Sequence, residues 1–165
     1  MFTRLHIIEN IKSIPKVGGI YFWYVDKKGA LQLGISVDGC TMKNGYYLIY
    51  IGLSKDLRMR LKWHTVDKHR PSSIKSGTLS VLRQKLSALL FNNWHSKDGV
   101  DQFMDKHMKV EYIVNPNYKQ VEVELIHSHV LPLNVKDNNH PFIKEMKKLN
   151  GQAKRNSLEY LATQP

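Results

Sequence analysis

The pattern of apolar and polar positions predicts three β-strands. Two of them are continuous apolar runs at residues 20–25 and 46–51, rich in the aromatic and β-branched side chains that are typical of buried strands. The third is an alternating segment at residues 110–114, and the turn signal Asn115-Pro116 ends it. These strands are the part of the chain that is best placed to form a sheet.

The segment between the first two strands carries signals for further β-structure. Leu31, Leu33 and Ile35 alternate with other residues, as expected of a half-buried strand. Short turn sequences that contain glycine stand at residues 26–29, 38–39 and 44–45. The segment is therefore predicted to be an inserted β-meander or hairpin.

Apolar residues at helical spacing predict the helices. The segment 79–90 has a face of five leucines after Ser76 or Thr78 as N-cap, and Asn117 is the expected N-cap of the segment 118–130, which Leu131-Pro132 ends. The predicted helices are residues 5–11, 54–64, 79–90, 118–130 and 140–161, of which the last is one helix or two.

The predicted helix at 54–64 carries polar groups on the face that should pack against the sheet. At about 100° per residue, Arg60 and His64 share a stripe with Leu57 and Leu61. Burying a charge without a partner is unfavourable. Arg60 therefore either binds a structural anion or lines a functional site, and its position alone leaves both open.

The predicted helix at 118–130 has a carboxylate among apolar residues. The inward face is formed by Tyr118, Val121, Leu125, Ile126 and His129. Glu122 lies in the middle of this face, whereas Glu124 lies toward solvent. Because glutamate is almost never fully buried unless it is paired, Glu122 is predicted to be a structural ion pair, with Arg60 as a candidate partner, or a metal ligand or acid–base group.

The charge of the chain favours a polyanionic partner. The 165 residues include 25 Lys and Arg against 14 Asp and Glu, a net charge of +11. Five of the cations lie largely off the apolar stripe of the predicted C-terminal helix: Lys144, Lys147, Lys148, Lys154 and Arg155. They form either a solvated face or a surface that contacts phosphates.

Several classes of protein lose support because their signals are absent. The longest apolar runs have six residues, far from the ~18 that a membrane helix needs. Glu9 and Asn10 interrupt the apolar start, so no signal peptide is expected, and a single cysteine, Cys40, rules out an internal disulfide. The motifs of zinc fingers, zinc proteases, P-loop NTPases and Rossmann dehydrogenases are missing. We expect a cytoplasmic protein without a membrane partner.

Two tripeptides and four polar residues give the sequence a family resemblance. The chain contains, in this order, Gly19-Ile20-Tyr21, Tyr50-Ile51-Gly52, Arg60, His64, Glu122 and Asn134. The arginine follows the second tyrosine by ten residues and the histidine by four more, and the asparagine follows the glutamate by twelve. This ordered set resembles the GIY-YIG nuclease superfamily over about residues 18–135. The segment 78–90 is also similar to the second helix of the restriction-enzyme-like branch.

The resemblance implies the fold. Members of the superfamily have a compact α/β (α+β) domain with a small three-stranded antiparallel sheet flanked by helices. We accordingly expect a single domain over residues 1–165, with a core at 18–135 and a C-terminal helical extension at 140–161. The 28 residues at 22–49 that separate the two tripeptides form a longer insertion than in many members.

The resemblance also implies the chemistry, which is hydrolysis of a phosphodiester by a metal-dependent endonuclease. Glu122 would hold one Mg²⁺ or Mn²⁺, and Arg60 would contact the non-bridging oxygens. Tyr50 or Tyr21 would take a proton from water, helped by the field of the cation or by a neutral His64. Asn134 would orient the Glu122 carboxylate or the scissile phosphate. Nucleic acid would be bound by Arg58, Lys62 and the five cations of the C-terminal helix.

Three readings of the function stay open at this point. The first is an endonuclease that cuts double-stranded DNA. Whether it cuts at a specific site, like a restriction enzyme, and whether it acts as a homodimer are both open. The second is a structure-specific repair or recombination nuclease that acts on branched DNA. The third is a DNA-binding module that keeps the fold and has lost catalysis.

Overall fold

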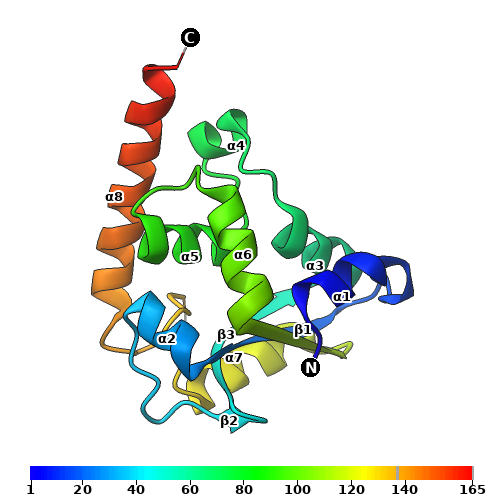
Figure 1. Cartoon of the computed structure of the whole chain (residues 1–165). Coiled ribbons are helices and arrows are strands. Elements are labelled where there is room, and N and C mark those ends of the chain that lie inside the picture. Colours follow the sequence, from blue (N-terminus) through cyan, green and yellow to red (C-terminus); the bar gives the residue numbers. More distant parts are fainter. Residues whose placement is uncertain (137, 165) are drawn as a thin grey trace.

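The computed structural model describes residues 1–136 and 138–164, which form an α+β fold around an antiparallel sheet (Figure 1). The strands are β1 Gly19–Asp26, β2 Met42–Lys43, β3 Tyr46–Ser54 and β4 Met108–Val114, in the order β2-β3-β1-β4. All three predicted strands are confirmed. The prediction of a three-stranded sheet is one strand short, because the two residues of β2 pair with the first two residues of β3.

The helices surround this sheet. They are α1 Arg4–Glu9, the 3₁₀ turn η1 Ile11–Ser13, α2 Lys27–Leu33, α3 Leu57–Val66, α4 Pro71–Ser76, α5 Val81–Phe91, α6 Lys97–His107, α7 Tyr118–Ser128 and α8 Ile143–Ala162. Each of the five predicted helical segments contains a helix, and the C-terminal one is a single helix. The N-cap of α5 is Ser80, because Gly77 with φ 73° ends the short helix α4 just before it. Asn117 precedes α7 without a side-chain cap bond.

The prediction of a β-meander between the two motif strands is wrong over its first half, which is helix α2. Asp26 caps this helix by accepting a hydrogen bond from Gly29 N at 2.6 Å, and Gly34 ends it in the left-handed conformation with φ 65°. Leu33 packs into the core while Leu31 is exposed, so the alternation of leucines does not mark a strand. The predicted hairpin exists: Asn44 and Gly45, with φ of 50° and 79°, turn β2 into β3.

Two layers of apolar residues hold the sheet. One face packs against α7, through Ile20 and Ile51 of the sheet and Ile126 of the helix. The other face packs against α1, α2, α3, α5 and α6, and α8 packs against α5 and crosses it (Figure 1). None of the helices in the described part of the chain is long and apolar enough to cross a membrane. The single domain over residues 1–165 stays a prediction.

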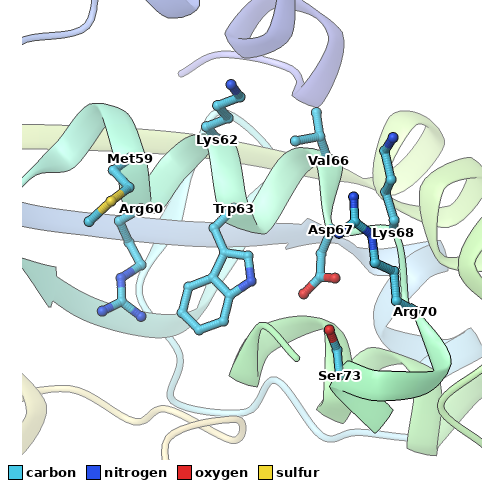
Figure 2. Close-up of a pocket in the computed structure, with 9 residues that line it drawn as sticks. All are labelled: Met59, Arg60, Lys62, Trp63, Val66, Asp67, Lys68, Arg70 and Ser73. Atoms are coloured by element: carbon cyan, nitrogen blue, oxygen red, sulfur yellow. The ribbon is translucent and has the colours of Figure 1, made fainter. Parts of the chain in front are cut away.

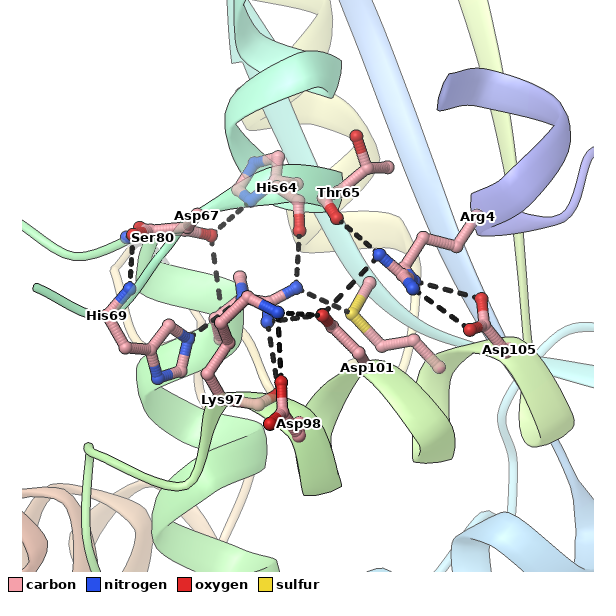
Figure 3. A network of polar contacts seen from close by, with 12 residues as sticks. Arg4, His64, Thr65, Asp67, His69, Ser80, Lys97, Asp98, Asp101 and Asp105 are labelled. Atoms are coloured by element: carbon pink, nitrogen blue, oxygen red, sulfur yellow. Dashed lines mark hydrogen bonds and ion pairs between the residues drawn. The ribbon is translucent and has the colours of Figure 1, made fainter. Parts of the chain in front are cut away.

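A buried polar network ties α1, α3, α5 and α6 together (Figure 3). Its centre is Arg83 of α5, whose side chain has no exposed surface and donates to Asp101 of α6 at 2.6 Å. The same guanidinium donates to the Nε2 atom of His69 at 2.9 Å and to the carbonyl of His64 at 3.2 Å. Because His64 belongs to α3, this network fixes the position of α3 relative to α5.

Candidate active site

The two motif tripeptides are neighbours in the sheet. In the antiparallel pairing of β1 and β3, Tyr21 lies opposite Gly52 and Trp23 lies opposite Tyr50. A Cβ atom at Gly52 would stand 2.4 Å from the hydroxyl oxygen of Tyr21, so any other residue there would displace the phenol. The register shifts between Trp23 and Tyr24, directly beside Tyr50, and such bulges are common next to active sites.

A chain of hydrogen bonds runs from α5 to the phenol of Tyr21. The Nδ1 atom of His64 is 2.5 Å from Ser80 Oγ, and its Nε2 atom is 2.9 Å from the Tyr21 hydroxyl. Ser80 Oγ already accepts the N–H of Arg83 at the start of α5. Ser80 is fully buried, so its own hydroxyl proton needs an acceptor, and Nδ1 is the acceptor that the described residues provide. We therefore assign the hydrogen of His64 to Nε2, which donates to Tyr21.

The two phenols are linked in turn. Their rings are 6.3 Å apart at 34°, and their hydroxyls share a hydrogen bond. Burial raises the pKa of Tyr21 well above its usual value and raises the pKa of Tyr50 to about 12. The hydrogen bond between the two hydroxyls lowers the pKa of Tyr50 and raises the pKa of Tyr21. Tyr50 is thus the phenol that ionises more easily, and Tyr21 is its hydrogen-bond donor.

Arg60 and Glu122 act on the same two phenols. Burial has the largest effect on the pKa of Tyr21 and of Tyr50. In addition, the charge of Arg60 lowers the pKa of both phenols, and the charge of Glu122 raises it. These charges come from α3 and α7, on opposite sides of the sheet. The structure therefore brings four of the six predicted catalytic residues into one electrostatic neighbourhood, and His64 is bonded to it through Tyr21.

Burial keeps His64 neutral. Desolvation, followed by the positive charges of Arg60, Arg83 and Lys85, lowers the pKa of His64 to about 3. The prediction that His64 helps by accepting a proton from a phenol does not fit this environment, because the assigned tautomer donates to Tyr21 and the ring is a weak base. His64 instead holds the phenol of Tyr21 in place.

The shifted pKa of His64 predicts a loss of stability in acid. The histidine titrates near 6.5 in the unfolded chain and near 3 in the folded one, so the unfolded state takes up the proton first as the pH falls. Its stabilising contribution is complete above pH 6.5, and about 2 kcal/mol of it is lost between pH 7 and pH 5. Urea unfolding at both pH values should give a smaller difference for His64→Gln than for the parent protein. An equal difference would contradict the buried neutral state.

A cavity of about 360 Å³ opens beside Tyr50, and Glu122 and Asn134 also line it. The predicted inward face of α7 is confirmed, since Ile126 is buried, Glu122 is half-buried and Glu124 is exposed. In the described part of the chain no three His, Cys, Asp or Glu side chains cluster as a complete metal-binding set. Among the described residues that line this cavity, Glu122 is the one with a carboxylate, and a carboxylate suits Mg²⁺, which commonly takes one or two of them together with water and phosphate oxygens.

Asn134 lies at this cavity in a different role from the predicted one. Its Oδ1 atom accepts from Ile51 N at 2.9 Å and its Nδ2 atom donates to Ile51 O at 2.8 Å. Leu133 N donates to Ile49 O on the same edge of β3. The carboxamide thus pairs with β3 as a neighbouring strand would, where β2 no longer covers the edge. Asn134 holds the strand that carries Tyr50, rather than orienting Glu122 or a phosphate.

Arg60 also lines a second cavity, of about 550 Å³, between α3 and α4 (Figure 2). Its guanidinium carbon lies 5.0 Å from the centre of the Trp63 ring, and both side chains point to the same side of α3 (Figure 2). Lys62, Lys68 and Arg70 add positive charge to this cavity. Arg60 therefore lines a basic depression on the surface while its charge acts on the two phenols.

The cations predicted to bind nucleic acid fall into three groups. Arg58 donates to the carbonyl oxygens of Ile14 and Lys12 at 2.6 and 2.5 Å, so it ties η1 to α3, and we leave it out of the proposed interface. Lys154 lies with its ammonium 5.7 Å from the centre of the Trp94 ring. The others are exposed: Lys62, Lys144, Lys147, Lys148 and Arg155.

Two residues of the site were not predicted, Ser80 and Lys85. Both belong to α5 and its cap, which the leucine pattern marks only as core. Lys85 lines the cavity of Tyr50 and is 5% exposed. At ~100° per residue it lies within about 60° of Leu82, at the border of the leucine face. The helical projection that selected Glu122 would have selected Lys85 too.

The family model of the GIY-YIG catalytic domain matches residues 19–156, most of the chain, including all six predicted catalytic positions. The chain belongs to the GIY-YIG nuclease superfamily. The match confirms the resemblance found in the sequence and extends it into α8. Comparison with curated proteins finds no match, and neither does comparison with solved structures.

Proposed function

We propose that the protein is an endonuclease that hydrolyses phosphodiester bonds in double-stranded DNA with the help of a divalent cation. The observation that carries this proposal is that Tyr50 and Glu122 line one cavity beside Tyr21 of the paired strand, and that the charges of Arg60 and Glu122 act on both phenols. The net charge of +11 and the exposed cations of α8 support an anionic polymer as substrate.

The phosphate is bound by Arg60 in this proposal. A guanidinium is always charged at physiological pH and offers two parallel donors that match two phosphate oxygens. Trp63 packs against the guanidinium and so restricts its orientation. Arg60 neutralises the charge of the diester in the ground state and the larger charge on the non-bridging oxygens in the transition state.

Tyr50 acts as the base that receives the proton of the attacking water. Tyr50 lines the cavity, whereas Tyr21 is 2% exposed and donates its hydroxyl hydrogen to Tyr50. The water oxygen bonds to phosphorus and the bond from phosphorus to the 3′ oxygen breaks, leaving a 5′-phosphate and a 3′-hydroxyl after the leaving oxygen takes a proton. Tyr21, His64 and Ser80 form the line of donors that stabilises the Tyr50 phenolate.

Glu122 would hold the cation, which is Mg²⁺ or Mn²⁺ in this proposal. A carboxylate oxygen is a hard ligand suited to these ions, and its place beside Tyr50 fits a cation that also contacts the scissile phosphate. When bound, the cation stabilises the developing negative charge and lowers the pKa of the groups around it. Glu122 then serves as its anchor in the cavity beside Tyr50.

Incubation with supercoiled plasmid tests the proposal. With Mg²⁺ we expect nicked or linear product with 5′-phosphate ends, and with EDTA in excess we expect the substrate to stay intact. Linear duplex and Y-junction DNA assayed in parallel distinguish cleavage at sites within a duplex from cleavage at branches. If the protein binds DNA in a salt-sensitive way but cleaves none of these substrates with Mg²⁺ or Mn²⁺, the nuclease proposal is refuted. The hypothesis of a DNA-binding module without catalysis would then be supported. Dimer formation and a cytoplasmic location stay predictions.

A further inference from the structure

Lys85 is a buried cation that the proposed reaction has not used. It is one of seven consecutive buried residues of α5, and its side chain reaches the cavity that Tyr50, Glu122 and Asn134 line. Lysine is almost never fully buried unless it is paired. A methionine of nearly the same volume could fill this position at less free energy, because it would bring no charge out of water. The position therefore calls for an explanation beyond packing.

The contacts of Lys85 hold its ammonium group over the proposed base. The Nζ atom donates to the carbonyl oxygen of Leu133 at 2.5 Å. Leu133 precedes Asn134, whose side chain is hydrogen-bonded to Ile51 of β3. It also lies 5.0 Å from the centre of the Tyr50 ring. Burial lowers the pKa of Lys85 to about 8, so the group is still charged at neutral pH. The main-chain carbonyl and the phenol ring together hold a positive charge beside Tyr50, at the cavity that Lys85 lines.

Lys85 and Arg60 act on the same centre from different elements. Besides burial, the charges of Arg60 and Lys85 both lower the pKa of His64, which is bonded to Tyr21. Arg60 comes from α3 and opens to the depression between α3 and α4, while Lys85 comes from α5 and lines the cavity of Glu122. A diester phosphate next to Tyr50 would lie close to Lys85 and within the field of Arg60.

We propose that Lys85 is a further catalytic residue, whose ammonium binds the phosphate oxygen that faces the Tyr50 cavity while Arg60 binds from the other side. This inference rests on the proposed nuclease function. An ammonium is a compact point charge with three donors, one of which Leu133 uses, and its remaining donors suit a single oxygen. Because phosphoryl transfer increases the charge on these oxygens, such a contact is stronger in the transition state than in the ground state.

Two substitutions separate the charge of Lys85 from its structural bond. Lys85→Met fills the volume without charge or donor, and Lys85→Gln keeps a donor for Leu133 O without charge. We expect both to lower the single-turnover rate at saturating DNA by at least about 10²-fold. DNA affinity in EDTA should change by less than about fivefold, because exposed phosphate contacts supply most of it. Urea unfolding should find Lys85→Met at least as stable as the parent. Lys106→Met, an exposed lysine of α6, is the matched control and should cleave normally.

Each outcome decides between the two proposals. If the parent protein cleaves DNA and both Lys85 variants cleave within about threefold of it, the role of Lys85 is refuted and the nuclease function stands. If Lys85→Gln restores the rate that Lys85→Met loses, the residue is a positioning residue that acts through Leu133, and the proposal of phosphate contact is overturned. If the parent protein cleaves none of the DNA substrates with Mg²⁺ or Mn²⁺, both proposals fall together.

Discussion

Glu122→Gln is expected to lower the single-turnover rate of DNA cleavage by about 10³-fold or more, and Arg60→Ala by a similar factor. Glutamine has nearly the shape of glutamate but lacks the charge that holds a divalent cation. Arg60→Ala removes a guanidinium. Among the described residues, it is the one cation whose charge lowers the pKa of both phenols. Both losses should be in the rate of the chemical step, because each group stabilises charge that grows as the phosphodiester breaks.

The same helix offers a control for the carboxylate. Glu124 is exposed on the solvent side of α7, two residues from Glu122, and Glu124→Gln should leave cleavage unchanged within about twofold. DNA affinity measured in EDTA and the midpoint of urea unfolding should differ little among these variants. Cleavage by Glu122→Gln at the rate of the parent protein would refute the role of this residue, and with it the proposed position of the cation.

The sequence was sufficient to predict the parts of the fold that depend on local pattern. Strands β1 and β3 are short apolar runs rich in aromatic and β-branched residues, and α7 has apolar residues at helical spacing, so all three can be recognised from local sequence. Helix α2 was missed because its signals are an Asp cap and a glycine at position 34 rather than an apolar stripe. The alternating leucines there suggested a strand, but the helix buries Leu33 and exposes Leu31.

The candidate site was predicted as a set of residues, but the roles within it depend on pairing between distant segments. That Asn134 binds the backbone of Ile51, 83 residues away, follows from the edge of β3 left uncovered by the short β2. The direction of the hydrogen bond from His64 to Tyr21 follows from Ser80, which is buried and accepts a hydrogen bond as the N-cap of α5. Neither feature leaves a local trace in the sequence, whereas Glu122 and Lys85 do, as charges on apolar helix faces.

The largest expected effect on stability is at Asp101. This carboxylate binds Arg83 at 2.6 Å and Lys97 at 2.6 Å, and Arg4 lies 3.5 Å away (Figure 3). Asp101→Ala would leave the fully buried guanidinium of Arg83 without its carboxylate, which costs about 3–5 kcal/mol in comparable sites. Urea unfolding with an unchanged m-value is the measurement. Asp98→Ala, which removes a carboxylate that is 88% exposed on the same helix, should change stability by less than about 0.5 kcal/mol.

A double substitution shows whether the network serves stability or position. Arg83→Met with Asp101→Leu removes both charges, so the penalty of an unpaired buried ion disappears and much of the lost stability should return. Arg83 also donates to the carbonyl of His64, and the double variant lacks this link between α5 and α3. We therefore expect the double variant to be stable but slow in DNA cleavage, because the contact from Ser80 through His64 to Tyr21 is less well held. A double variant that is stable and fully active would mean that the apolar packing of α3 and α5 alone aligns the phenols.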